Sequence, residues 1–254
     1  MGYREWAPPA ALRSALACLW VQVVPGSGPP RTGLVLPDGC SDLIWEQGRG
    51  AFVAGPDTGP APTLLAPGTV FAGVRFRPGA GGDALGVPLS ELRDLRVGLA
   101  DVRRDLARQL PATLEPADAV SALTAVAGRL TDERPPDAAI LEAGRLLGHP
   151  AARAEDVAAQ VGLSGRQFRR RCEAAVGYGP KTLQRVLRFR RFVSLVDSAG
   201  WAAGGAAGGP VGGPGRLAQA AVDSGYADQP HLTRETVRLA GLSPAALIRE
   251  RVGA

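Results

Sequence analysis

Residues 217–244 read Leu-Ala-Gln-Ala-Ala-Val-Asp-Ser-Gly-Tyr-Ala-Asp-Gln-Pro-His-Leu-Thr-Arg-Glu-Thr-Val-Arg-Leu-Ala-Gly-Leu-Ser-Pro, and this stretch decides the fold of the C-terminal half. An earlier segment, residues 155–180, repeats its pattern. The small residue and the turn glycine of that segment, Ala158 and Gly162, recur 63 positions later, and Gly177 and Pro180 recur 64 positions later. The chain therefore holds two copies of one motif, with one residue added in the second copy.

Each copy predicts two short helices joined by a turn. In the first copy Gly162 allows the left-handed backbone that ends a helix, and Ser164 is a good N-cap for the next helix. Phe168, Cys172 and Val176 follow at a spacing of four, which predicts one buried stripe. This pattern is typical of a helix-turn-helix unit; the alternative is a duplicated helical packing module with a solvated arginine face. The equivalent residues of the second copy are Gly225, Asp228, Leu232, Thr236 and Ala240.

A family resemblance rests on these residues. Residues 225–235 together with 241–244 resemble the second helix-turn-helix of AraC-family transcription regulators, and residues 163–171 resemble the first. The resemblance covers about residues 135–254 and implies seven helices, with 181–196 as the long helix that joins the two units. By matching position to position, it implies that the base-reading residues are Arg166, Arg169, Arg170, Gln229, Pro230, Thr233 and Arg234.

The chemistry of these side chains agrees with DNA reading. Arginine can bind the O6 and N7 atoms of guanine, and glutamine can bind adenine in the same bidentate way. Pro230 offers only apolar contact, for instance to a thymine methyl. His231 is interpreted as a neutral or phosphate-facing residue rather than a metal ligand. Phosphate contacts would set affinity and register, and the residues expected to make them are Ser164, Lys181, Arg188, Arg190, Arg191 and His231.

The charge of the chain is distributed unevenly. Residues 151–254 carry 15 Lys and Arg against 8 Asp and Glu, whereas residues 1–150 carry 14 Arg against 16 Asp and Glu. A basic C-terminal part favours a polyanion such as double-stranded promoter DNA as its partner. Codon bias is the alternative source of the arginines, because 28 of the 29 basic residues are Arg, but it does not explain the missing acidic residues.

One segment departs from the AraC pattern. Residues 198–215 form a Gly- and Pro-rich insertion between the two units, longer than the short connection that the family uses. A segment of this composition behaves as a random coil. The insertion therefore predicts that the two units dock less rigidly than in the family.

The N-terminal half predicts a β-rich region followed by helices. Strands are expected at 17–24, 33–36, 43–46, 51–54 and 69–77, in a barrel or a sandwich, and helices at 89–102, 103–110 and 116–130. The fold class is therefore α+β. The best linker is 132–137, which divides the chain into a sensor or dimerisation domain (1–133, β-rich to 100 and helical over 101–133) and an AraC-type DNA-binding domain (134–254).

Three N-terminal segments, 36–45, 73–80 and 87–92, are similar to an uncharacterised domain that precedes AraC-type units in bacteria. This resemblance implies an arrangement, either a sensor or a dimerisation module, but no ligand. Polar residues beside the strands suggest an effector pocket. The alternative is a turn at Asp38-Gly39, a core tryptophan, and arginines that merely pair with acidic residues. The pocket residues in the first interpretation are Asp38, Cys40, Asp42, Trp45, Arg75 and Arg77.

Several function classes are disfavoured. Three scattered cysteines cannot build a disulfide framework, and neither of the two histidines has a further ligand at metal-binding spacing. The chain has no apolar run of 18 residues, so we expect no membrane partner, and a reduced, cytoplasmic location. We expect no cofactor, no metal and no catalytic residue. The sequence thus predicts a transcription regulator controlled by a small-molecule effector or by homodimerisation, with RNA polymerase as a further partner; the alternative is an enzyme acting on a small molecule or a DNA adduct through its N-terminal domain.

Overall fold

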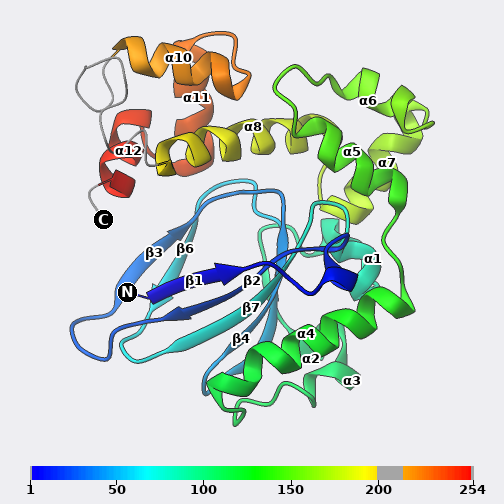
Figure 1. Ribbon diagram of the computed structural model, residues 1–254, viewed down its shortest axis with the longest axis vertical. Helices are drawn as coiled ribbons and strands as arrows, with labels where there is room; N and C mark the ends of the chain where they lie inside the picture. The colour runs from blue at the N-terminus through cyan, green and yellow to red at the C-terminus, as the bar shows by residue number, and fades with distance from the viewer. Residues whose placement is uncertain (1, 199–213, 253–254) are drawn as a thin grey trace.

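The computed structural model describes residues 2–198 and 214–252 and confirms the α+β fold class. Figure 1 shows the antiparallel β-structure in the lower part of the molecule and a group of helices above it. Nearly all of the predicted Gly-rich insertion, 199–213, lies outside the described residues. Among those that are described, no helix is both long and apolar enough to cross a membrane.

The N-terminal strands form two antiparallel sheets. Six strands pair in the order β1-β2-β7-β4-β5-β8, and β3 pairs with β6 in a second, two-stranded sheet. In β4 the buried residues Leu43 and Trp45 alternate with Asp42 and Ile44, so the two faces of the large sheet carry different side chains. The strand bounds are β1 Gly2–Trp6, β2 Leu16–Val23, β3 Arg31–Val35, β4 Ser41–Glu46, β5 Gly50–Ala54, β6 Ala61–Leu65, β7 Val70–Phe76 and β8 Arg96–Gly98.

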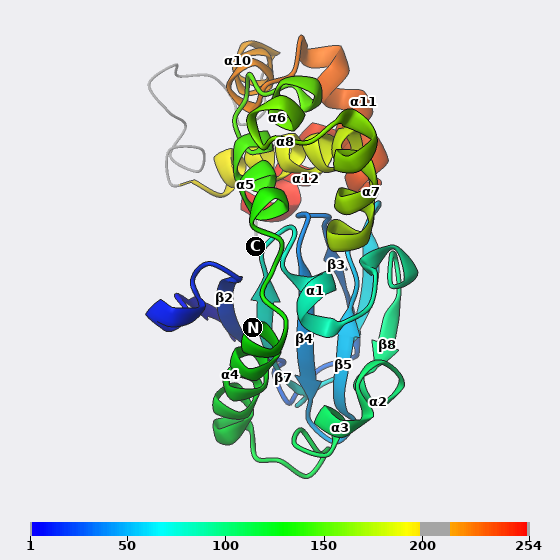
Figure 2. The same cartoon turned by 90° about the vertical axis from the view of Figure 1, so that its right-hand side faces the viewer.

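One face of the large sheet packs against α4, which spans Pro116–Glu133 (Figure 2). The apolar residues of α4 recur at helical spacing, as in Leu123, Val126 and Leu130, and they join the sheet residues Leu43 and Val74 in one core. The other face carries a smaller apolar cluster, Trp20, Val24, Leu65 and Phe71, which links the large sheet to β6. The remaining N-terminal helical segments are η1 Ala10–Leu12, α1 Gly81–Leu85, η2 Leu89–Glu91, α2 Leu99–Val102 and α3 Arg104–Ala107.

The predicted helix at 89–102 is wrong. The segment holds the short helix η2, the strand β8 and the single turn α2. Asp94 takes a left-handed φ of 59°, which breaks a helix, and its carboxylate binds the backbone N–H and the hydroxyl of Thr58 at 2.6 and 2.8 Å. Arg96 pairs with Asp57 at 2.7 Å. Contacts to residues almost 40 positions away therefore override the local helical pattern.

All five predicted strands are present within two residues of their expected ends, but three further strands were missed. Every residue of β1 is exposed, β6 contains Pro62, and β8 has three residues. Edge strands of this kind lack the regular alternation that marks a half-buried strand. The missed strands all lie at sheet edges or in the two-stranded sheet.

The described C-terminal residues form the seven helices that the AraC resemblance implies. Gly162 and Gly225 end the first helix of each unit with φ of +70° and +86°. The two predicted stripes, from Phe168 to Val176 and from Leu232 to Ala240, are buried in one apolar core. The helices are α5 Ala138–Leu147, α6 Ala154–Gln160, α7 Gly165–Val176, α8 Pro180–Asp197, α10 Pro214–Ser224, α11 Gln229–Ala240 and α12 Pro244–Val252.

Candidate nucleic-acid interface

The first helix-turn-helix unit consists of α6 and α7. Ser164 caps α7: its hydroxyl accepts the N–H of Gln167 at 3.3 Å, and the Gln167 side chain accepts the N–H of Ser164 at 3.0 Å. This reciprocal pair fixes where α7 begins. The predicted base-reading arginines Arg166, Arg169 and Arg170 are all exposed on its outer face. Arg169 also pairs with Glu173 one turn along at 2.9 Å, and both side chains remain accessible to solvent.

The second unit consists of α10 and α11. Asp228 caps α11 by accepting the N–H of His231 at 2.6 Å. Pro230 and Arg234 are exposed, whereas Gln229 and Thr233 are half-buried, and the Thr233 hydroxyl donates to the Gln229 carbonyl at 3.0 Å. The ring of His231 packs edge-on against Tyr226 at 5.2 Å between centroids.

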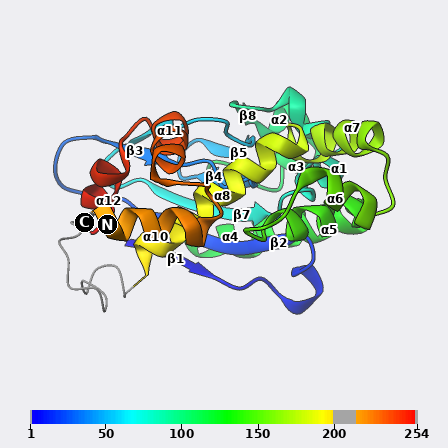
Figure 3. The same cartoon turned by 90° about the horizontal axis from the view of Figure 1, so that it is seen from above.

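Helices α7 and α11 lie on the same side of α8. Figure 2 and the view from above in Figure 3 both place α5 and α10 on the opposite side. The structure therefore carries all seven predicted base-reading residues on two helices that share one side of the C-terminal half. Whether they contact bases stays a prediction.

The cations of α8 have different surroundings. Lys181 is exposed and pairs with the equally exposed Glu155 at 3.3 Å. Arg188 is half-buried. Arg191 donates to the Ser224 carbonyl at 2.7 Å, at the end of α10, and so connects α8 to the second unit. Arg190 lines a cavity on the border with the N-terminal half. The residues expected to bind phosphate thus do not form one surface.

Sequence reasoning missed the ion pair between α8 and α11. Arg185 donates to both oxygens of Glu235, at 2.7 and 2.9 Å, and both side chains are largely buried. The pair fixes α11 against the long helix. No spacing in the sequence reveals it, because 50 residues separate the partners and only the helix packing brings them together.

Four of the six predicted pocket residues lie together in the β-structure. Asp42 and Arg75 are register partners on β4 and β7, and Arg75 Nε donates to Asp42 at 3.1 Å. Arg75 Nη1 lies 3.4 Å from Asp38, whose carboxylate also accepts the N–H of Cys40 at 2.9 Å. The indole N–H of Trp20 donates to Asp42 at 2.8 Å. Each charged group in this polar cluster has a partner, as the alternative interpretation expected.

The other two predicted pocket residues lie elsewhere. Trp45 is three positions from Asp42, so it points to the opposite face of β4, where it is fully buried and donates to the Pro111 carbonyl at 2.8 Å. Arg77 lies beyond the end of β7, and its Nε donates to the Arg13 carbonyl at 2.8 Å. Arg77 therefore takes a different partner from Arg75, because the strand stops between the two residues.

The electrostatics of the polar cluster keep its thiol neutral. The neighbouring Asp42 carboxylate raises the pKa of Arg75, which stays cationic. Burial and the Asp38 carboxylate raise the pKa of Cys40 well above its ordinary value, although Arg75 and Arg190 act in the opposite direction. Cys40 is therefore a structural residue rather than a nucleophile. The described residues contain no group of three or more His, Cys, Asp or Glu side chains that could hold a metal ion.

The N-terminal half contacts the ends of both α7 and α11. A β-carbon on Gly177, the C-cap of α7, would collide with Pro56, and one on Gly241, the C-cap of α11, would lie 3.5 Å from Pro60. Residues 55–60 between β5 and β6 form this contact loop. Asp94 and Arg96 hold the contact loop through Thr58 and Asp57.

A second contact joins α7 to the domain border. Arg171 donates to both oxygens of Asp137, and Asp83 of α1 accepts the N–H of Asp137 at 2.9 Å. Asp137 also caps α5. Asp137 therefore connects three parts of the chain: its backbone N–H binds the N-terminal half, and its carboxylate binds both α5 and α7.

Comparison with known proteins gives two kinds of likeness. Residues 4–98 match a domain of unknown function, DUF6597, a range that includes the three N-terminal segments singled out in the sequence. No curated protein matches the chain. Among solved structures, the chain is similar to ToxT from Vibrio cholerae strain SCE256 with bound unsaturated fatty acid, at 12% identity and a TM-score of 0.44 over 94% of this chain and 97% of that one. It is also similar to ToxT from strain O395, at 9% identity and a TM-score of 0.42 over 99% and 97%.

Proposed function

We propose that the chain is a sequence-reading DNA-binding transcription regulator. Residues 134–254 read the DNA, and residues 1–133 form the domain that senses an effector or dimerises. The observation that carries this proposal is the pair of helices α7 and α11, which lie on one side of α8 with exposed arginines on both (Figure 3). The net positive charge of residues 151–254 supplies the attraction to phosphate.

The repeated sequence supports the same proposal. The second unit resembles that of AraC-family regulators over residues 225–244, and its N-cap and C-cap are formed as that motif requires. In this proposal the first two turns of α7 and α11 enter successive major grooves, where Arg170 and Arg234 bind guanine. Promoter DNA is the partner, the protein works in the cytoplasm, and RNA polymerase and a second copy of the chain are further partners.

The contact loop gives the N-terminal half a role in DNA reading. It lies against the C-terminal ends of both α7 and α11, and the Asp94 and Arg96 contacts hold it in shape. We infer that the loop sets the spacing between the two units. An effector that moved the N-terminal half would then change which operator spacings the protein accepts.

Selection of binding sites from a random duplex library tests the proposal. The full chain is mixed with the library at two salt concentrations, and the bound DNA is sequenced. An enriched motif with two half-sites is the expected result. Salt-sensitive binding without enrichment would mean that the arginines contact only the phosphate backbone, and the duplicated helices would then be a packing module rather than a reading device.

A further inference from the structure

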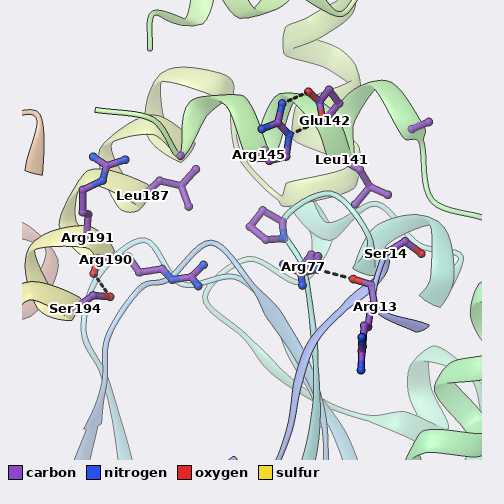
Figure 4. A pocket seen from close by; sticks show the side chains of 14 residues that line it. Arg13, Ser14, Arg77, Leu141, Glu142, Arg145, Leu187, Arg190, Arg191 and Ser194 are labelled. Carbon is purple, nitrogen blue, oxygen red and sulfur yellow. Dashed lines mark hydrogen bonds and ion pairs between the residues drawn. The ribbon is translucent and has the colours of Figure 1, made fainter. Parts of the chain in front are cut away.

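A cavity of about 630 Å³ lies between the two halves of the chain. Figure 4 shows its walls, which come from the residues just before β2 and just after β7 on one side and from α5 and α8 on the other. Its size falls within the range of about 300 to 1,000 Å³ that small-molecule sites occupy. Because both halves line the cavity, a molecule bound there would contact both of them.

The charge of this cavity is strongly one-sided. Its lining holds a single carboxylate, Glu142. That carboxylate already accepts hydrogen bonds from Nε and Nη2 of Arg145 on the same helix. The other four arginines of the lining have no carboxylate within ion-pair distance among the described residues, although Arg13 donates to the Pro8 carbonyl and Arg191 to the Ser224 carbonyl. The five arginines of the lining are Arg13, Arg77, Arg145, Arg190 and Arg191.

Two of these arginines come from different halves of the chain. Arg77 from the end of β7 and Arg190 from α8 extend toward each other from opposite walls (Figure 4). Arg77 uses one N–H on the Arg13 carbonyl, and a guanidinium has five N–H donors, so most of its donors stay available.

The polar cluster of the β-structure provides the contrast. There Arg75 is enclosed by Asp38 and Asp42, and Trp20 completes the hydrogen bonds of Asp42. In that cluster the guanidinium of Arg75 and both carboxylates have partners within the protein. The cavity has the opposite arrangement, since four of its five arginines lack an acidic partner among the described residues, and most of the remaining lining, including Leu141 and Leu187, is apolar.

We propose that the cavity binds a small organic anion, a phosphate ester or a polycarboxylate, whose oxygens bridge Arg77 and Arg190. Guanidinium groups match carboxylate and phosphate oxygens in a bidentate geometry, and an anion between two cations replaces their repulsion with two attractions. Leu141 and Leu187 pack against the carbon skeleton of the ligand. Occupation of the site therefore favours the arrangement in which the two halves are in contact.

The regulatory meaning of the site rests on the proposed function. If the chain reads DNA, the bound anion is the effector, and it acts by holding the contact loop against α7 and α11. The binding itself does not depend on DNA. It can therefore be measured on the protein alone.

Isothermal titration calorimetry of the full chain tests the binding. The probes are inorganic pyrophosphate and citrate, titrated separately at an ionic strength held constant with sodium chloride. The variants are Arg77→Gln and Arg190→Gln, and the matched control is Arg108→Gln, which removes the same charge from an exposed arginine outside the cavity. Thermal unfolding of each variant without probe shows whether it is folded.

The expected result is saturable binding of one probe molecule per chain. Each cavity variant should weaken it at least about tenfold, whereas the control should bind like the unchanged protein. Binding of pyrophosphate alone would identify a phosphate ester as the ligand class, and binding of citrate alone a polycarboxylate. Absence of binding at millimolar probe, or equal binding by all variants, would overturn the proposal.

A library selection with and without the better probe separates the two proposals. Probe binding without any enriched DNA motif would leave the anion site standing and refute the regulator. An enriched motif in a protein that binds neither probe would support the regulator and refute the anion site. An enriched motif whose preferred spacing shifts when the probe is added would support both.

Discussion

The two helix-turn-helix units share one backbone design but are held by different contacts. Arg171 in α7 and Glu235 in α11 occupy equivalent positions of the repeat, and each forms a bidentate ion pair. Arg171 pairs with Asp137 at the border of the two halves, whereas Glu235 pairs with Arg185 on α8. The same position thus anchors each unit to a different neighbour, and the sign of its charge selects which one.

The glycines that end the two reading helices also differ in how closely the N-terminal half contacts them. Gly177 and Gly241 both end a reading helix in the left-handed region, with φ of +94° and +70°. The first is enclosed by Pro56 and Leu89 of the N-terminal half, while the second only approaches Pro60. The backbone requirement is therefore common to both units, but the first unit is held more closely by the N-terminal half.

Exchange of these glycines for alanine should give the largest difference between the units. Gly241→Ala should cost about 1–2 kcal/mol of unfolding free energy, the strain of a left-handed alanine. Gly177→Ala adds a collision with Pro56 and should cost about 3–4 kcal/mol. Urea unfolding of both variants measures the difference. Equal losses would mean that the N-terminal half does not press against α7.

Loss of the anchoring ion pairs should give the next largest decreases in unfolding free energy. Arg185→Ala leaves Glu235 mostly buried, at 14% exposure, without its partner and should cost about 2–3 kcal/mol. Arg171→Ala should cost only about 1 kcal/mol, because Asp137 keeps the N–H groups of Ala139 and Ile140 as the cap of α5. Denaturant unfolding measures both losses.

Arg145→Ala is the control for the ion pairs. It breaks a well-exposed pair with Glu142 on one helix and should change stability by less than about 0.5 kcal/mol. A loss for Arg185→Ala no greater than that of the control would show that α11 needs no anchor on α8.

Substitutions on the reading helices should weaken DNA binding, whereas a substitution elsewhere on the surface should not. Arg170→Ala and Arg234→Ala should each weaken binding to the selected operator by about 1–3 kcal/mol, because each is expected to contact a base edge. Each loss should appear at one half-site only. Titration of labelled operator and of scrambled duplex measures it, with Arg108→Ala as a control on the N-terminal half. If a variant loses affinity for the operator and for the scrambled duplex equally, the substituted residue does not read a base.

The sequence predicted those features of the fold that depend on local chemistry. Both helix caps, Ser164 and Asp228, and both turn glycines were found because a few neighbouring residues suffice to specify a cap. The sequence leaves open whether Arg75 lines an effector pocket or pairs with an acidic residue. It does not identify Asp42 as the partner, since the two residues become neighbours only through the register of β4 and β7.

Features that depend on packing were not predicted. The cavity between Arg77 and Arg190 joins residues more than 100 positions apart, and the sequence assigned the first to an effector pocket in the sheet and the second to DNA phosphate. The helical pattern of 89–102 failed for a related reason, since the Thr58 and Asp57 contacts outweigh local preference there. Long-range partners explain each of these differences.

The smallest predicted effect concerns the core position that the two units fill differently. Cys172 is fully buried in the first unit, and Thr236, whose hydroxyl donates to the Leu232 carbonyl at 2.8 Å, takes its place in the second. Burial raises the pKa of Cys172 from 9.0 to about 12, so the folded protein retains a proton that the unfolded chain loses above pH 9. Stability from the neutral thiol is thus complete below pH 9 and declines as the pH rises toward 12.

Cys172→Thr copies the second unit into the first and removes this titration. The unchanged protein should lose about 1 kcal/mol more unfolding free energy than the variant between pH 8 and pH 10, because Cys172 ionises on unfolding in that range and a threonine does not. Urea titrations at the two pH values, taken as a difference between the proteins, cancel the contribution of the other thiols. Identical pH dependence would mean that the core of the first unit admits the thiolate, and the two units would then differ in packing at this position as well as in their anchors.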